Sequence, residues 1–205
     1  MISYPFGIED PFKGLFVEPG DFYKTMTADS NIRAENISYP TVTIYPIVVD
    51  YRRTVKEMIR AGKYSDTHDI APRNYPVPQE KIGRVLNYKM GPFFLNTRPI
   101  KSRQVLNGFK KIGAIPSQLP ELLALGEQHP ELQNQFPIVA LEAVEHCFIR
   151  EWVVFLGGCR VARGLYTTSC YFQRWDDMPW RFAAILPENF LISGEKLIKA
   201  FHSSR

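Results

Sequence analysis

The chain contains few cysteines, and their spacing matches no zinc-binding motif. There are three in 205 residues, Cys147, Cys159 and Cys170, so they cannot all pair with one another within one chain. Zinc ribbons and fingers need closely spaced ligand pairs, and this sequence has none. We therefore expect reduced cysteines with small, buried side chains, as is usual in the cytoplasm.

The sequence also lacks a recognisable targeting segment and any long apolar run. Its first residues, 1–6, have neither the basic region nor the apolar region of a secretory signal peptide. No apolar stretch approaches the roughly 20 residues that a membrane-spanning helix needs. These features predict a cytoplasmic protein without a membrane partner.

The sequence also has little excess of one sign of charge over the other. The 25 Lys and Arg residues exceed the 21 Asp and Glu residues by four, and the basic pairs Arg52-Arg53 and Lys110-Lys111 stand apart from each other. This composition permits nucleic-acid binding but does not indicate it. A nucleic-acid-associated protein of a mobile element is kept as one alternative. It predicts a contiguous basic face that contains Arg52, Arg53 and Lys56.

The residues that are present describe an ordinary globular protein. Hydrophobic residues make up 45% of the chain and charged residues 22%, a balance that favours a packed core over disorder. The pattern predicts an α+β fold with a mixed, mainly antiparallel sheet packed against two to three short helices. We expect an irregular N-terminal arm over 1–40, a single α+β domain over 41–186 and a C-terminal helical extension over 187–205.

Capping residues and glycines predict helices near 54–61, 103–112 and 118–126. Side-chain oxygens at the start of a helix accept from its unpaired N–H groups, and glycine often ends a helix in a left-handed conformation. The expected N-caps are Thr54, Ser102 and Ser117, and the expected glycine stops are Gly62, Gly113 and Gly126. Ser193 is expected to cap a terminal helix.

Runs of β-branched and aromatic residues predict strands near 42–50, 137–142, 151–156 and 180–186. Gly91-Pro92 predicts the turn of a hairpin within residues 82–96. Residues 140–155 also tolerate helical spacing, and periodicity leaves both alternatives open there. Phe182 lies in the middle of the last apolar run, so we expect it to be buried.

An aromatic and charged cluster over residues 166–180 predicts a binding surface. Rings provide contact area at low entropy cost, and charges provide specificity. The residues expected to bind are Tyr166, Tyr171, Arg174, Trp175 and Asp177. The preferred function is therefore a non-enzymatic binding module for an unknown protein or small ligand, without a catalytic residue, a metal or a cofactor.

The alternative interpretation of the same cluster is structural. Phe172, Trp175 and Trp180 would then fill the core while the charged side chains between them are solvated. Exposure of the rings decides between the two interpretations. If the rings are buried, the cluster no longer supports a binding surface.

A metal-assisted hydrolase that uses His68 or His146 is the competing function. Asp66-x-His68-Asp69 could supply metal ligands, although Asp side chains in a turn more often bond nearby backbone N–H groups. If residues 140–155 are helical, Glu142 and His146 share a face one turn apart. Cys147 is adjacent to His146, and on a strand the two side chains would point to opposite faces, which disfavours a thiol nucleophile.

Five segments carry a resemblance to other proteins: YPIVVDY at 45–51, EMIRAGKY at 57–64, LPELLALGEQHP at 119–130, FPIVAL at 136–141 and RFAA at 181–184. Through them the chain resembles a group of bacterial hypothetical proteins frequent in small-genome candidate phyla. The resemblance implies a bacterial source. It implies no activity, because the group has none assigned.

A second resemblance concerns the fold. The segment Gly113–Ser117, the following helix with Glu121, and the ending Trp180–Ala183 are similar to C-type-lectin-like domains of the formylglycine-generating-enzyme kind. This chain lacks the Arg and the Trp that such domains carry in the first motif, and it has no match for their catalytic cysteines. The resemblance implies strands around Ile138 and Phe155 and a binding surface built from the loops before the last strand.

Overall fold

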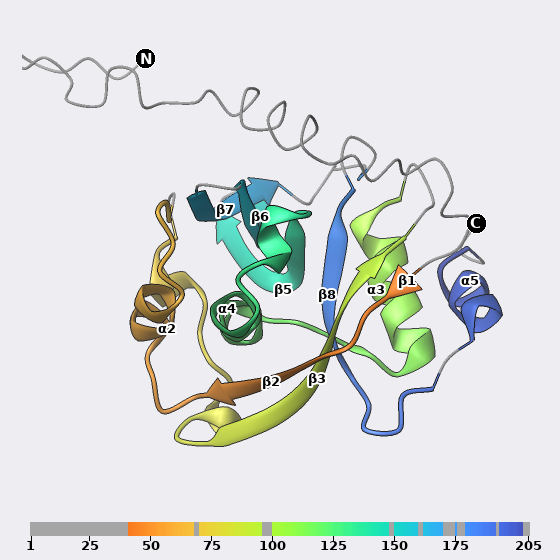
Figure 1. Ribbon diagram of the computed structural model, residues 1–205, viewed down its shortest axis with the longest axis horizontal. Coiled ribbons are helices and arrows are strands. Elements are labelled where there is room, and N and C mark those ends of the chain that lie inside the picture. Colours follow the sequence, from red (N-terminus) through yellow and green to blue (C-terminus); the bar gives the residue numbers. More distant parts are fainter. Residues whose placement is uncertain are drawn as a thin grey trace, which may run out of the picture.

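The computed structural model describes residues 41–67, 70–95, 100–147, 150–159, 162–169, 175, 179–191 and 193–202. Within these ranges, eight strands form one sheet that is packed against four α-helices (Figure 1). The helices are α2 (Val55–Ala61), α3 (Ser102–Ile112), α4 (Leu119–Gln128) and α5 (Gly194–His202). No helix in this part of the chain is long and apolar enough to cross a membrane.

The sheet has the strand order β1-β3-β8-β5-β6-β7, with β2 also paired to β3 and β4 to β8. Its neighbours are antiparallel except for β5 and β8, which run parallel. The expected α+β fold with a mixed, mainly antiparallel sheet is therefore confirmed. The strands are β1 (Thr41–Val42), β2 (Tyr45–Asp50), β3 (Val85–Phe94), β4 (Ile115–Pro116), β5 (Ile138–Cys147), β6 (Arg150–Cys159), β7 (Ala162–Ser169) and β8 (Arg181–Leu186).

The hairpin predicted at Gly91-Pro92 is wrong, because β3 runs straight through both residues. Val42 lies opposite Phe93 and Tyr45 opposite Met90, so β1 and β2 keep one register along β3. The break between β1 and β2 falls opposite Pro92, which has no N–H to donate. Gly91 is needed for close packing, since a Cβ there would lie 2.5 Å from the Val42 Cγ2 atom.

The edge of β2 that faces away from β3 is hydrogen-bonded to two side chains: that of the last residue of α4 and that of the residue after it. The Gln128 amide accepts from Val48 N–H at 2.9 Å and donates to the Val48 carbonyl at 2.8 Å. The Nε2 atom of His129 lies 3.1 Å from the Pro46 carbonyl oxygen. These contacts hold α4 beside β2.

Residues 137–156 form the antiparallel hairpin of β5 and β6, so the helical alternative for 140–155 is wrong. Consecutive side chains of β6 point to opposite faces of the sheet. Val154 packs into one cluster, and Val153 packs into the other. Both sides of this hairpin are buried, which explains why its apolar residues lack a clear polar alternation.

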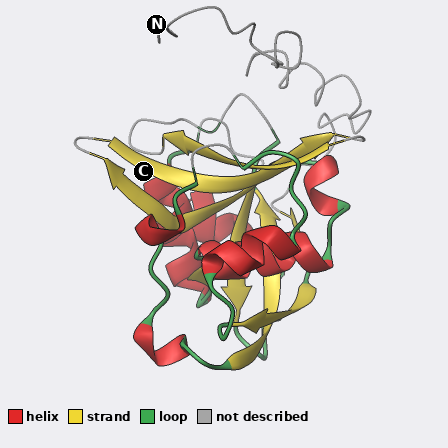
Figure 2. Cartoon of the chain, turned by 90° about the vertical axis from the view of Figure 1, so that its left-hand side faces the viewer, coloured by secondary structure: helices red, strands yellow, loops and turns green. Residues whose placement is uncertain are grey.

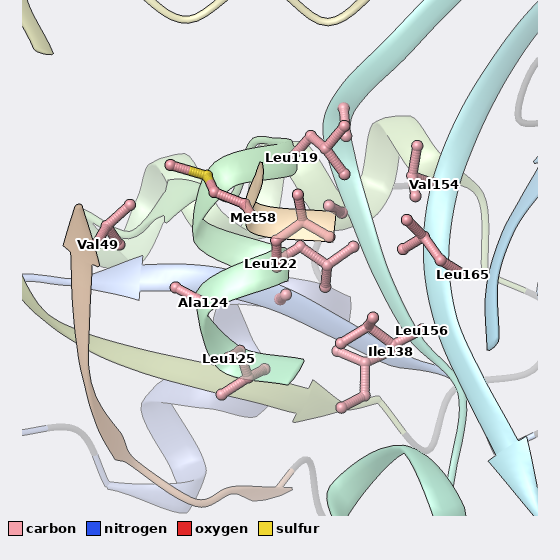
Figure 3. Packing of buried hydrophobic residues seen from close by; sticks show 14 of the residues in the cluster. Val49, Met58, Leu119, Leu122, Ala124, Leu125, Ile138, Val154, Leu156 and Leu165 are labelled. Carbon is pink, nitrogen blue, oxygen red and sulfur yellow. The ribbon is translucent and has the colours of Figure 1, made fainter. Parts of the chain in front are cut away.

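The first core cluster lies between the sheet and the helices α2 and α4. Figure 3 shows Leu122 of α4 among side chains from α2 and several strands, including Met58 and Leu165. The side chain of Leu122 is fully buried. Nearly all of α4 is buried, so this short helix acts as the centre of the cluster.

The second cluster lies on the opposite side of the sheet, beneath α3 and α5. Phe109 of α3 and Phe201 of α5 meet edge to face with their ring centroids 5.7 Å apart. Phe182 of β8 is buried here, as the sequence predicted. Figure 2 shows the helices in red alongside the curved yellow sheet, and α5 contacts α3 directly.

The N-cap predicted for α2 is confirmed, whereas the left-handed glycine predicted at its C-terminal end is wrong. Thr54 Oγ1 accepts from the N–H of Glu57, and Glu57 accepts from Thr54 N–H. Gly62 has a right-handed φ of −65°, whereas Lys63 takes the left-handed φ of 51°. Gly62 is instead a close-packing site, because a Cβ there would collide with the ring of Tyr64.

The ends of α3 and α4 also depart in part from prediction. Gly113 ends α3 with a left-handed φ of 70°, as expected. The N-cap positions are Lys101 and Gln118, one residue away from the expected serines in each case. Helix α4 continues through Gly126 to Gln128.

Candidate ligand-binding pocket

Trp175, the centre of the predicted binding surface, is a core residue. It is 2% exposed, and its ring meets Trp180 and Phe182 edge to face, with centroids 4.8 Å and 5.5 Å away. Its indole N–H donates to Ser102 Oγ at 2.9 Å, so burial leaves the nitrogen satisfied. The structural interpretation therefore holds for Trp175 and for Trp180, which is 3% exposed.

The other members of the predicted surface give it no support. Tyr166 is half-buried in β7, with its ring centroid 5.4 Å from that of Phe155. Tyr171, Arg174 and Asp177 lie outside the described residues. Burial thus removes Trp175 from the predicted surface, and a binding role for Tyr171, Arg174 and Asp177 stays a prediction.

The histidines of the proposed metal site are not described by the structure. His68 lies outside the described residues, and so does the side chain of His146. Glu142 lies where β5 is irregular, because its register with β6 shifts between Ala140 and Val144. Glu145 accepts from Asn74 Nδ2 at 2.5 Å and from Tyr75 Oη at 3.2 Å. The described part of the chain contains no group of three metal-ligating side chains.

Two of the three cations in the predicted basic face are paired with carboxylates. Arg52 Nε lies 2.7 Å from Asp50, and its hydrogen bonds lower the pKa of that carboxyl to about 2. Arg53 forms two hydrogen bonds to Glu127, at 2.6 Å and 3.1 Å. Lys56 is exposed on α2. These pairs reduce the net positive charge that the face offers to a polyanion.

A different pocket lies where α3, the segment after β8 and α5 meet. Figure 1 shows α3, α5 and the blue loop after β8 on its right-hand side. Its volume is about 450 Å³, within the usual range for small-ligand sites of about 300–1,000 Å³. The lining residues are Lys111, Ile112, Pro187, Asn189, Phe190, Leu191, Lys196, Lys199 and Ala200. Among these described residues, three carry ammonium groups and none carries a carboxylate.

Local sequence features explain how this pocket forms. Pro187 follows the last residue of β8, and its carbonyl accepts from Phe190 N–H at 3.0 Å, which closes a turn. Ser193 Oγ then accepts from Lys196 N–H at 3.4 Å at the start of α5, as the sequence predicted. The chain therefore reverses direction and lays α5 against the end of α3.

The lysines come from both helices. Lys111 is in the last turn of α3, and its Nζ donates to the carbonyl of Ala200 at 3.3 Å. Lys196 and Lys199 are exposed and three residues apart, so they share a face of α5. A cation at the end of α3 is also favoured by the helix dipole.

The apolar part of the pocket is held by the second core cluster. Phe190 is half-buried, and its ring meets that of Phe93 nearly at a right angle, with centroids 6.4 Å apart. Ala200 is buried, whereas Leu191 is 94% exposed. The pocket thus combines a fixed apolar wall with an uncovered leucine and a cationic rim.

Sequence reasoning missed this pocket because its residues are distant along the chain. In the sequence, the strands β4 to β8 lie between Lys111 and Lys196. The pair Lys110-Lys111 therefore looked isolated. One signal was present in the terminal helix. Lys196 and Lys199 lie three apart, opposite the apolar face that includes Leu197, shortly after Phe190 and Leu191.

Comparisons with family models, with curated proteins and with solved structures find no match for this chain. Strands do occur at Ile138 and Phe155, where the lectin-like resemblance implied them. The resemblances to bacterial hypothetical proteins and to lectin-like domains nevertheless stay predictions.

Proposed function

We propose that this protein is a binding module for a small anion that carries an apolar part, and that the pocket between α3 and α5 is its site. The observation that carries the proposal is the lining of this pocket. Three lysines border an apolar wall, and no carboxylate is among the described lining residues. The binding role follows the expectation from sequence, but the site differs from the 166–180 surface.

The physical basis is complementarity between the pocket and such a ligand. An anion gains Coulombic energy near several ammonium groups, and this gain decreases as salt screens the charges. The apolar part of the ligand would cover Phe190 and Leu191 and remove their surface from water. Both contributions are needed, because exposed ion pairs alone are weak.

The proposal does not use the lectin-like resemblance. It places the ligand against α3 and α5, and not in the loops before β8. The cytoplasmic location expected from sequence belongs to the same proposal, since small organic anions are abundant there. A direct binding measurement is the first test that it requires.

The test is an amide NMR titration of the full chain with benzenesulfonate, with uncharged benzyl alcohol as the matched ligand. Benzenesulfonate should shift the amides of Asn189, Leu191 and Lys196 in a saturable manner, and benzyl alcohol should bind more weakly. The double variant Lys196→Glu with Lys199→Glu should weaken benzenesulfonate binding by about tenfold or more, because it reverses two charges of the rim.

A second double variant provides the control. Lys56→Glu with Lys63→Glu makes the same change in net charge on exposed residues in and just after α2, away from the pocket. This variant should bind benzenesulfonate as the unmodified protein does. Equal losses in both variants, or no saturable shifts at the pocket, would sink the proposal.

A further inference from the structure

We infer that Lys196 is the residue by which the α3–α5 pocket selects an anion, and that Lys111 positions α5 without contacting the ligand. This inference rests on the proposed function and assigns separate roles to two lysines that line the same pocket. Its grounds are the partners that each ammonium group already has and the place of each lysine in its helix.

Lys111 is held by the backbone of α5. Its Nζ atom donates to the carbonyl oxygen of Ala200 at 3.3 Å, and Lys111 has a further interaction within the chain. Helix α5 covers Gly194–His202, so this carbonyl belongs to the last turn, where the helix itself provides no N–H partner. Lys111 thus caps α5 and joins its last turn to the last turn of α3.

A close contact in the core holds the same two helices together. The ring of Phe201 in α5 packs on α3 at Gly108, where a Cβ would collide with that ring. Leu197 and Ala200 of α5 are buried in the same cluster. The position of α5, and with it the shape of the pocket, therefore depends on these buried contacts and on Lys111.

Lys196 is available to a ligand. It is exposed on α5 and lines the pocket, and within the part of the chain that the structure describes its Nζ atom has no ion pair or hydrogen bond. An anion can therefore pair with Lys196 without displacing a contact that holds the fold.

The helix ends also favour an anion near Lys196 over an anion near Lys111. Lys196 is the third residue of α5, and the N-terminal end of a helix carries partial positive charge. Lys111 lies beside the last turns of both α3 and α5, where unpaired carbonyls carry partial negative charge. The backbone therefore attracts an anion at the first position and repels it at the second.

Lys199 is the third lysine of the lining, and it already has an interaction within the chain. Glu195 lies four residues before it, a spacing at which opposite charges attract on a helix. Position 192, four residues before Lys196, is an isoleucine and offers no such partner. Lys199 should therefore contribute less than Lys196 to the attraction of the ligand.

The experiment measures two ligands of similar size, benzenesulfonate and uncharged benzyl alcohol, by amide NMR titration of the full chain. Lys196→Gln should weaken benzenesulfonate binding about three- to fivefold and leave benzyl alcohol binding unchanged, because one exposed ion pair is lost. Lys199→Gln should change benzenesulfonate binding by less than about twofold. Lys56→Gln, at an exposed position of α2, is the distant control and should have no effect.

Lys111→Gln should give a different pattern. Without the hydrogen bond to Ala200, α5 is held less firmly, so the binding of both ligands should weaken by the same factor, about threefold or more. Lys111→Arg should restore both, because a guanidinium can donate to the same carbonyl. Salt provides a second readout. The decrease of benzenesulfonate affinity with added salt should be much smaller in Lys196→Gln and should persist in Lys111→Gln.

The outcomes separate the inference from the proposed function. If Lys196→Gln changes nothing, or if Lys199→Gln weakens benzenesulfonate binding equally, the assignment to Lys196 is overturned and the anion-binding proposal stands. If Lys111→Gln weakens benzenesulfonate binding alone, or if Lys111→Arg restores neither ligand, the positioning role of Lys111 is overturned. If neither ligand binds the pocket of the unmodified protein, the inference and the proposed function are both overturned.

Discussion

Tyr51 donates its hydroxyl proton to the fully buried carboxylate of Glu121, with 2.5 Å between the two oxygens. The same carboxylate oxygen accepts from Lys81 Nζ at 2.8 Å, and the other accepts from Gln118 N–H at 3.1 Å. This cluster joins the end of β2, the first turn of α4 and the 3₁₀ helix at Gln79–Lys81. A buried charge needs such partners, because its removal from water is expensive.

Lys81→Met should destabilise the protein, because it leaves the Glu121 carboxylate buried without its cation. We expect a loss of about 2–4 kcal/mol in the free energy of unfolding, measured by urea denaturation. Adding Glu121→Gln to this variant should recover part of the loss. Arg52→Gln removes an exposed ion pair and should leave the urea midpoint unchanged. Equal effects of Lys81→Met and Arg52→Gln would contradict the importance of the buried cluster.

Alkaline pH should destabilise the fold through Tyr51, Tyr64 and Tyr75. Burial raises the pKa of each hydroxyl, and Glu121 beside Tyr51 and Glu145 beside Tyr75 raise it further. Unfolded tyrosines titrate near pH 10, so the unfolded state binds fewer protons than the folded state above that pH. Their contribution to stability is fully present below about pH 10 and then falls by about 1.4 kcal/mol per pH unit for each tyrosine.

The variant Tyr51→Phe tests the sign and size of this effect. The free energy of unfolding should fall less steeply above about pH 10 in the variant, by the share of one tyrosine. Of the ten tyrosines in the chain, these three should add their tyrosinate absorbance only when the protein unfolds. Tyrosinate formation by all three residues in a protein that is still folded at about pH 10 would contradict the expected shifts.

Gly126→Ala should destabilise α4, although alanine usually favours a helix. A Cβ at Gly126 would lie 3.0 Å and 3.2 Å from the two methyl carbons of Leu156 and would collide with the Tyr64 hydroxyl. We expect a loss of about 1–3 kcal/mol in thermal or urea unfolding. Gly194→Ala in α5 is the matched control, because its Cβ meets open space and should stabilise by up to about 1 kcal/mol. Stabilisation by both alanines would show that Gly126 is not tightly packed.

Phe182→Ala should remove a central part of the second core cluster. Phe182 is 1% exposed and meets the ring of Trp175, so its truncation should cost about 3–5 kcal/mol. Leu191→Ala, at a position that is 94% exposed, should change stability by less than about 0.5 kcal/mol. Urea unfolding followed by tryptophan fluorescence measures both. A small loss for Phe182→Ala would mean that the cluster repacks around the vacancy.

A helix end could be predicted from the sequence where the contact that determines it joins residues close together in the chain. Thr54 and Glu57 are three residues apart, and Gly113 directly follows its helix, so both ends could be predicted. Gly91-Pro92 was misread because its turn signal was overridden by distant partners. Val42 approaches Gly91 from the neighbouring strand, and the break between β1 and β2 lies opposite Pro92.

The binding site could not be predicted for the same reason. Tryptophan beside charged residues is compatible with a surface or a core, and the contact between Trp175 and Ser102 spans 73 positions. Lys111 meets α5 through the carbonyl of Ala200, a contact between positions 89 apart. Only the packing of α5 against α3 brings these lysines to one pocket.

The hydrogen bonds between Gln128 and Val48 bear on how concentrated solutions of the protein behave. An uncovered strand can recruit another chain through a row of backbone donors and acceptors, which is how fibrils grow. Along β2 this row is interrupted at successive outward positions, because Pro46 has no N–H, Gln128 occupies both groups of Val48, and Arg53 N–H bonds to the Asp50 carbonyl. This border of the sheet is therefore a poor template for polymerisation, and a single amide side chain supplies much of that protection.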